Sequence, residues 1–139
     1  MIALPPSDVP LQCINQAAIE FNIPAKLIIS VLEIERGKVG QIVQNKNKTY
    51  DVGPMQINSS WLPTLARYGI TQHDLQYNVC KNIEVGSWIL SKMIANGKDL
   101  LSGIGNYHSH TASLNKHYGS MVKINYARIM MAMNDGGLS

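Results

Sequence analysis

Aromatic residues and charges are scarce in this sequence. Its 139 residues include one Phe and two Trp, and Asp, Glu, Lys and Arg together make up 15%. A nucleic-acid-binding surface combines clustered basic residues with aromatic side chains, and no such stripe occurs here. The formal net charge of +3 suits an anionic polymer but is too small to indicate nucleic acid. We therefore expect no nucleic-acid partner.

Long apolar segments are missing as well. No run approaches the ~18 apolar residues that a membrane-spanning helix needs, so we expect no stable membrane insertion. The start of the chain, Met1-Ile2-Ala3-Leu4, is too short for the apolar core of a signal peptide and lacks the charged residues that precede one. We expect that a leader has been removed from this chain.

Only two cysteines occur, Cys13 and Cys80, and they lie far apart in the sequence. This excludes the CxxC spacing of a zinc site, and we expect no metal. If the two cysteines pair, closing such a loop contributes roughly 4 kcal/mol in the chain-entropy model, and the disulfide indicates an oxidising compartment. The alternative is two unrelated buried thiols, which are common in protein cores.

What the sequence does contain is a folded composition with helical periodicity. Hydrophobic residues make up 45% of the 139 positions, enough for one domain with its own core. Apolar residues recur at helical spacing in the segments 11–21, 24–36, 58–69, 71–75, 78–95, 100–107 and 113–133. Periodicity is lost between 38 and 52, which predicts a loop or small β-hairpin. We expect a mainly α fold, with an extended lead-in at 1–10, one domain at 11–133 and a frayed tail at 134–139.

One carboxyl group lies at the end of a strongly apolar segment. Glu35 follows the run Leu27-Ile28-Ile29-Ser30-Val31-Leu32 and falls in the last turn of a helix that we expect to be buried. Burial and the negative end of the helix dipole both raise the pKa of a carboxyl group, which can then act as a general acid near neutral pH. Glu33 points about 200° away on the same helix, so the two do not form a paired dyad. The alternative is an ordinary exposed carboxylate at a helix end.

The segment Gly53-Pro54-Met55-Gln56 follows this helix and suits the recognition of a sugar. Gly53 lets a ligand approach the backbone closely. Met55 offers an adaptable apolar contact to a pyranose face, and Gln56 can both donate to and accept from an acetamido group. The alternative is a plain turn before a capped helix.

The order of these motifs resembles a known family. Glu35 and Gly37 form an acid-x-Gly motif, the segment from Gly53 to Asn58 reads Gly-x-Met-Gln-Ile-Asn, and Tyr107-His108-Ser109 and Tyr126-Ala127 follow. This order is similar to that of the lytic transglycosylases with a lysozyme-like fold. Within that family it is most similar to the specialised VirB1-like group of secretion and conjugation machines. The resemblance covers most of the chain.

The resemblance implies roles for individual residues. Glu35 is implied to be the catalytic acid and base, with the hydroxyl of Tyr126 near it. The implied substrate-binding residues are Gly53, Met55, Gln56, Tyr107, His108 and Tyr126. Cys13 and Cys80 match a cysteine pair typical of small secreted members. The chain departs from the family pattern at Arg36, where Ser is usual, and at His108, where Asn is common.

The family chemistry that the resemblance implies is cleavage of the β-1,4 bond between MurNAc and GlcNAc in peptidoglycan. The MurNAc end closes to a 1,6-anhydro sugar, and no cofactor is needed. The resemblance further implies a place in the bacterial periplasm, with glycan strands and proteins of a secretion or conjugation apparatus as partners. We expect a monomer.

Asp51 leaves a second interpretation of the chemistry open. If its carboxylate is aimed into the cleft beside Glu35, hydrolysis by water becomes possible and the protein is a muramidase. If it hydrogen-bonds backbone amides of its own loop, as Asp often does in turns, it has no chemical role. A third interpretation is a non-catalytic module that binds peptidoglycan and needs no acid.

Overall fold

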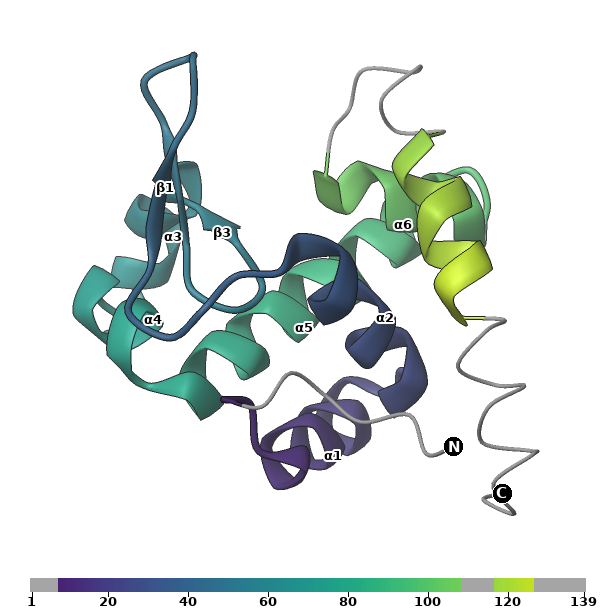
Figure 1. Ribbon diagram of the computed structural model, residues 1–139, viewed down its shortest axis with the longest axis horizontal. Coiled ribbons are helices and arrows are strands. Elements are labelled where there is room, and N and C mark those ends of the chain that lie inside the picture. The colour runs from purple at the N-terminus through teal and green to yellow at the C-terminus, as the bar shows by residue number, and fades with distance from the viewer. Residues whose placement is uncertain (1–7, 109–116, 127–139) are drawn as a thin grey trace.

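The fold is a group of helices with one small sheet (Figure 1). The structure is a computed structural model and describes residues 8–108 and 117–126. Its helices are α1 (Leu11–Phe21), α2 (Ala25–Glu35), α3 (Leu62–Ala66), α4 (Gln72–Tyr77), α5 (Val79–Asn96) and α6 (Leu100–His108), with a short 3-10 helix η1 (Ser59–Trp61). A further helical stretch covers 117–126. The prediction of a mainly α fold is confirmed.

The sheet has three short antiparallel strands in the order β1-β2-β3. Strands β1 (Ile42–Gln44) and β2 (Tyr50–Val52) form the hairpin predicted between 38 and 52, with Val43 opposite Asp51. Strand β3 (Ile57–Asn58) pairs with β2 and was not predicted. Two residues are too few to show the alternation by which a strand is recognised in a sequence.

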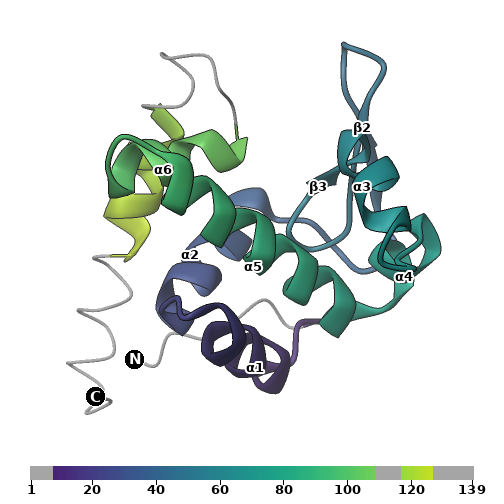
Figure 2. The same ribbon diagram turned by 180° about the vertical axis from the view of Figure 1, so that it is seen from behind.

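Helix α5 is the centre of the fold. It runs through the middle of the molecule and packs against α1, α4 and α6 (Figure 1). Its face toward the core carries Ile83, Ile89 and Leu90, all nearly inaccessible to solvent. Seen from behind, α1 crosses below α5, while α6 and the hairpin stand on its other side (Figure 2). The long helix therefore supports both sides of any site that lies above it.

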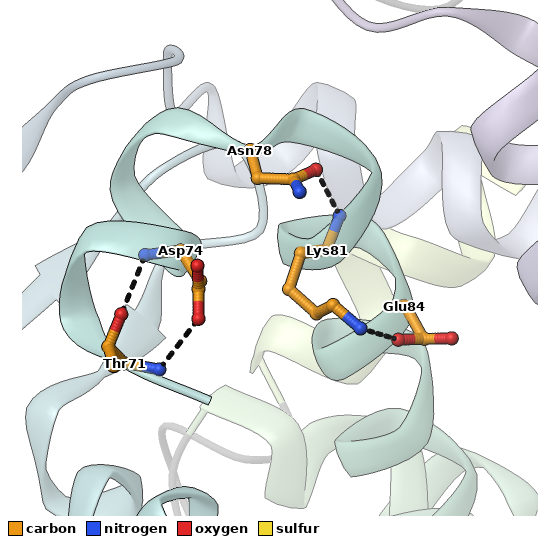
Figure 3. A network of polar contacts seen from close by, with 5 residues as sticks. All are labelled: Thr71, Asp74, Asn78, Lys81 and Glu84. Atoms are coloured by element: carbon orange, nitrogen blue, oxygen red, sulfur yellow. Dashed lines mark hydrogen bonds and ion pairs between the residues drawn. The ribbon is translucent and has the colours of Figure 1, made fainter. Parts of the chain in front are cut away.

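Side-chain caps fix the starts of α4 and α5 (Figure 3). The Thr71 hydroxyl accepts from the Asp74 amide at 3.1 Å, and the Asp74 carboxylate accepts from the Thr71 amide at 3.0 Å. The Asn78 side chain accepts from the Lys81 amide at 3.0 Å. Such caps satisfy amides that have no partner within the helix, which is why both starts could be predicted at these residues.

The two cysteines form a disulfide in this structure. Cys13 on α1 and Cys80 in the first turn of α5 are 67 positions apart, and their Cα atoms are 5.0 Å apart. The bond ties the first helix to the central one. Of the two alternatives for the cysteines, the structure therefore has the disulfide, which is consistent with an oxidising compartment outside the cytoplasm.

The ends of the chain bear on two further expectations. Most of the lead-in at 1–10 and all of the tail at 134–139 lie outside the described residues. The predicted last helix at 113–133 is described only over 117–126, where it is helical. Among the helices that the structure describes, none has the length and apolar character needed to cross a membrane.

Candidate active site

Glu35 lies where the structure has a cavity. It is the last residue of α2, a helix in which all six residues from Leu27 to Leu32 are buried. Its side chain lines a cavity of about 440 Å³ together with residues of the hairpin, β3, η1, α5 and α6. We call this the Glu35 cavity. In Figure 1 the hairpin and α6 stand apart above α5, and all three contribute residues to the lining of this cavity.

The pKa of Glu35 is raised to about 7 from an ordinary value of 4.5. The largest cause is burial, because a charged carboxylate loses the solvation that it would have in water. The nearby charge of Asp51 raises the pKa further, whereas a hydrogen bond from Tyr118 lowers it. The net result is a carboxyl group that is about half protonated near neutral pH, as a group that both gives and takes a proton requires.

Two tyrosines surround this carboxyl group. The Tyr118 hydroxyl is close enough to Glu35 to act on the pKa of its carboxyl group, and Tyr107 is close enough for the charge of Glu35 to raise its pKa. Burial is the largest cause of the raised pKa of both phenols. Both hydroxyls therefore stay protonated at neutral pH and can act only as uncharged donors or acceptors.

Tyr118 was not predicted. The family resemblance pointed to Tyr126, which in the structure is half-buried and packs against the core. Positions 118, 122 and 126 share one face of a helix, so periodicity alone does not distinguish the two tyrosines. The helix is tied to α2 by Asn125, whose amide donates to the Glu33 carboxylate at 2.9 Å. The role of Tyr126 stays a prediction.

A contact between two glycines joins the acid to the motif that follows it. Gly37 is so close to Gly53 that a Cβ at position 37 would lie 1.9 Å from the Gly53 carbonyl oxygen. No side chain fits there, which explains the glycine in the acid-x-Gly motif. Helix α2 ends at Glu35, close to the predicted end at 36, and the left-handed residue that caps it is Arg36, with φ of 56°.

Gln56 is held at the edge of the cavity by the same carbonyl group. Its backbone amide and its side-chain amide both donate to the Gly53 oxygen at 3.0 Å. Gln56 has a positive φ of 52°, an uncommon conformation for a residue other than glycine. Because its side chain lines the Glu35 cavity, the bond leaves its carbonyl oxygen as a possible acceptor for a ligand.

Met55 points away from the cavity, into the core. Its side chain is fully buried against Gly86 on α5, where an added Cβ would be 2.4 Å from the sulfur. Its carbonyl oxygen accepts from the Tyr107 hydroxyl at 2.8 Å. Met55 thus anchors the loop and places Tyr107, while the contacts of Met55 and Gly53 with a substrate stay a prediction.

Asn82 is a functional candidate that sequence reasoning missed. This residue of α5 is fully buried, and its carbonyl accepts from the Met55 amide at 3.0 Å. Its amide group donates to the carbonyl oxygens of Val52 and Leu75 at 3.0 and 2.9 Å. Asn82 therefore fixes the loop on which Gln56 stands. The only signal in the sequence is a polar residue at a position that periodicity makes apolar.

Asp51 lies in the same cavity as Glu35. It is half-buried on β2 and accepts from the Asn58 side-chain amide at 3.0 Å. Its partner is thus a side chain of the neighbouring strand, and its charge is felt by Glu35. This position is compatible with both interpretations of Asp51. As a lining residue of the cavity it can be a second carboxylate, and through Asn58 it can be a structural residue.

The walls of the cavity differ in chemistry. One wall, formed by the hairpin, β3 and the start of η1, offers mainly amides and hydroxyls, and the other, formed by the end of η1, α5 and α6, offers mainly apolar and aromatic groups. The first set is Asn45, Asn47, Thr49, Asn58 and Ser60, and the second is Trp61, Ile89, Met93 and Tyr107, with the amide of Asn106 beside them. A sugar ring with polar edges and an apolar face fits between walls of this kind.

The remaining predicted residues are placed as follows. His108 is the last residue of α6, and its side chain lies outside the described part of the chain. Within residues 8–108 and 117–126, no three His, Cys, Asp or Glu side chains gather as a metal site would require.

Comparison with known proteins places the chain in a family. Residues 12–130 match the model of the Transglycosylase SLT domain. The chain belongs to this family of lytic transglycosylases. Among individual proteins, it is 30% identical over 122 residues to the invasion protein IagB of Salmonella typhimurium, covering 84% of this chain and 76% of IagB. It is 31% identical over 129 residues to a peptidoglycan-binding-like protein of Escherichia coli, covering 84% and 77% of the two chains.

Proposed function

We propose that this protein is a lytic transglycosylase that cleaves the β-1,4 bond between MurNAc and GlcNAc in peptidoglycan. The observation that carries the proposal is the position of Glu35: half-buried, in a cavity with one polar and one apolar wall, with a pKa of about 7. The family match gives the class of reaction. The cavity supports Glu35 as the group that performs it.

The proposed reaction uses Glu35 twice. The protonated carboxyl group gives its proton to the glycosidic oxygen as the bond from that oxygen to C1 of MurNAc breaks. The substrate's own acetamido group stabilises the positive charge at C1. The Glu35 carboxylate then takes the proton of the C6 hydroxyl, whose oxygen bonds to C1 and closes the 1,6-anhydro ring. A pKa of about 7 makes both steps accessible to one group.

Tyr118 and Gln56 support this reaction without transferring a proton. The Tyr118 hydroxyl stabilises the carboxylate form after the first step, because it lowers the pKa of Glu35. The Gln56 side chain faces the cavity and is pinned to Gly53. It is therefore preorganised to hold an acetamido group of the substrate.

Hydrolysis is the second candidate function, and one observation favours it. Asp51 lines the cavity and its charge acts on Glu35, so a water molecule between the two carboxyl groups could replace the C6 hydroxyl as nucleophile. The Asn58 amide holds Asp51, which gives this carboxylate a structural task in either case.

Product mass distinguishes the candidates. Purified peptidoglycan is digested with the wild-type protein, Glu35→Gln and Asp51→Asn, and the fragments are weighed. We expect anhydro ends, each one water lighter than a reducing end, from the wild type and from Asp51→Asn. Glu35→Gln should reduce turnover by at least about 10²-fold, the usual contribution of a general acid. Reducing ends that disappear in Asp51→Asn would instead identify a muramidase, and binding without any release of fragments would identify a binding module.

The biological setting follows from the relatives. One is named an invasion protein and another a peptidoglycan-binding-like protein. We carry these over as a role in opening the wall locally for a secretion or conjugation apparatus, in the periplasm. The Cys13–Cys80 disulfide supports an oxidising compartment of this kind.

A further inference from the structure

The polar wall of the Glu35 cavity is a connected set of hydrogen bonds. It runs from the turn of the β1–β2 hairpin to Asp51 on β2. Its members are Asn45, Asn47, Thr49, Asp51 and Asn58, and all five line the cavity. Figure 1 shows the hairpin standing up from α5 with its turn pointing away from that helix. The wall therefore leads from the carboxylate of Asp51 to the outer end of the hairpin.

The Thr49 hydroxyl is the centre of this set. Its oxygen accepts from the side-chain amide of Asn45 at 3.2 Å and from that of Asn58 at 3.0 Å. The hydroxyl donates its own proton to Asn47 Oδ1 at 2.6 Å. A hydroxyl group has one proton to donate and two lone pairs that accept, so Thr49 has used all three. Thr49 therefore holds the wall together and has no further hydrogen bond to offer a ligand.

Two backbone amides fix the direction of the bonds in this wall. The Thr49 backbone N–H donates to the Asn47 side chain at 3.1 Å, so the atom that it meets is the side-chain oxygen. The Ser60 backbone N–H donates to the Asn58 side chain at 3.0 Å and fixes that amide in the same way. Asn58 thus turns its NH₂ group toward both Thr49 and Asp51. Flipping either amide would place two donors against each other.

The same bonds leave two atoms of the wall available to a ligand. The Asn47 oxygen accepts twice from Thr49, which leaves the NH₂ group of Asn47 as a donor. The NH₂ group of Asn45 is bonded to Thr49, which leaves the Asn45 oxygen as an acceptor. Neither atom has a partner among residues 8–108 and 117–126. The wall thus offers a ligand one uncharged donor and one uncharged acceptor.

We propose that Asn47 and Asn45 bind an acetamido group of the glycan and that Thr49 positions them for it. Because it concerns the same cavity, this role rests on the proposed function. An amide has one carbonyl oxygen that accepts and one N–H that donates, so it matches the available pair. An ammonium group would place donors against the Asn47 NH₂ group, and a carboxylate would place acceptors against the Asn45 oxygen. Each mismatch leaves a polar group of the wall without its hydrogen bond, which opposes binding.

The acetamido group that this wall binds belongs to a GlcNAc ring. In the proposed reaction, the acetamido group of the MurNAc ring at the cleaved bond is engaged at its own C1. Another ring must therefore supply the group that the wall binds, and the rings on either side of that MurNAc are GlcNAc. Removing the acetyl group from GlcNAc alone should disturb the contact with the wall and leave the chemistry at C1 intact.

Selective deacetylation of the glycan tests this role. Soluble glycan strands are prepared in two forms, one fully acetylated and one deacetylated at GlcNAc only. We expect kcat/KM of the wild type to be roughly tenfold lower on the deacetylated strands, mainly through KM, because one hydrogen bond of substrate binding is lost. Asn47→Asp should reverse this preference. Its carboxylate still accepts from Thr49, and its second oxygen accepts from the ammonium group of the deacetylated ring.

Gln44→Glu is the matched control for the change of charge. Gln44 lies on β1 in the same hairpin and is exposed, but it does not line the cavity. This variant makes the same replacement of an amide by a carboxylate, so it should keep the wild-type activity and the wild-type preference for acetylated strands. A reversal of the preference in Gln44→Glu would show that the overall charge of the hairpin decides it, and not a contact at Asn47.

Variants of Thr49 separate its positioning role from packing. Thr49→Val keeps the shape of the side chain but removes the hydroxyl, so most of the preference for acetylated strands should be lost. Thr49→Ser keeps the hydroxyl and should keep the preference. The preference is a ratio of two substrates measured on one protein, so a general loss of stability or activity does not change it.

Two further results would overturn the assignment and leave the chemistry of Glu35 in place. These are equal kcat/KM of the wild type on the two strands, and an unchanged preference in Asn47→Asp. Binding of both strands to the Glu35→Gln protein, measured by calorimetry, should show the wild-type preference without any cleavage. If the wild type cleaved neither strand, the lytic proposal would fail, and this binding measurement would still decide the role of the wall.

Discussion

The Glu35 cavity and the surface around Glu20 and Glu84 each bring two carboxyl groups together, with different results. In the cavity, burial is the main cause that raises the pKa of Glu35 to about 7, and Asp51 adds to it. At the surface around Glu20 and Glu84, the hydrogen bond from Lys81 lowers the pKa of Glu84, while burial and Glu84 raise the pKa of Glu20. The proximity of two carboxyl groups is therefore not enough to produce an acid catalyst. The pKa of Glu35 is raised to about 7 because, among the residues that the structure describes, no cation acts on Glu35 to offset its burial.

The largest expected effect comes from the contact on which the cavity is built. Gly37→Ala places a Cβ 1.9 Å from the Gly53 carbonyl oxygen, which is backbone and cannot swing aside. We expect a loss of about 3 kcal/mol or more in the free energy of unfolding, and loss of lytic activity, since overpacking forces the backbone to shift. Urea unfolding measures the first effect and peptidoglycan digestion the second.

Gly69→Ala is the matched control for this variant. Gly69 has a φ of +74°, but an added Cβ would meet nothing within 4 Å. The strain of a left-handed alanine alone costs roughly 1–2 kcal/mol. If Gly37→Ala were no more destabilising than Gly69→Ala, the glycine contact would not be what joins the acid to its loop.

The next effect concerns the cost of burying Glu35. The pKa of Glu35 is 4.5 when unperturbed and about 7 in the folded protein, so the unfolded chain loses this proton at lower pH. Stability is therefore lost as the pH rises from about 4.5 to about 7, and Glu35→Gln should avoid that loss. We expect Glu35→Gln to melt a few degrees above the wild type at pH 8, since about 1 kcal/mol shifts the Tm of such a domain by roughly 4 °C.

The same melting experiment at pH 4 is the control. Both states of the wild type then keep the Glu35 proton for the most part, so the two proteins should melt at similar temperatures. A Glu35→Gln protein that melts below the wild type at pH 8 would contradict the cost of burial. It would also weaken the case for Glu35 as a general acid.

The sequence predicts the helices that surround the site better than the contacts between side chains within it. The helix 11–21 and the start of α5 at Asn78 follow from periodicity and capping, which are local properties. Glu35 at the end of a buried helix follows from the same reasoning. Strand β3 and the cap at Arg36 do not, because short segments are set by the contacts that surround them.

Long-range contacts decide the rest of the site. Asn82 is 30 positions from Val52, to which its amide donates, and nothing in the local pattern announces that pairing. Met55 is a residue type that can contact the apolar face of a sugar, but in the structure its side chain is buried against Gly86. Tyr118 and Tyr126 occupy the same helical face, so the choice between them depends on how that helix docks on α2 through Asn125.

Tyr118→Phe gives a smaller effect, on the pH dependence of activity. The hydrogen bond from Tyr118 lowers the pKa of Glu35, so its removal should raise that pKa. The alkaline limb of the pH–rate profile should move up by about one pH unit, which corresponds to one hydrogen bond to a charged group. Tyr126→Phe is the matched variant. A shift of the limb in Tyr126→Phe and not in Tyr118→Phe would favour the assignment that the family resemblance implies.

The smallest effect is expected at the ion pair between Lys81 and Glu84, and it has the opposite sign to that of Glu35→Gln. The pKa of Glu84 is lowered mainly by its hydrogen bond from Lys81, so its contribution to stability is present above the unfolded pKa and is lost as the pH falls. Both partners are more than a third exposed, at 35% and 38%. Glu84→Gln should therefore destabilise the protein by less than about 1 kcal/mol at pH 7, and not at all near pH 3. Each variant's change in the free energy of unfolding can be plotted against pH. If the changes for Glu35→Gln and Glu84→Gln were equal in size and opposite in sign, burial would not outweigh ion pairing in this fold.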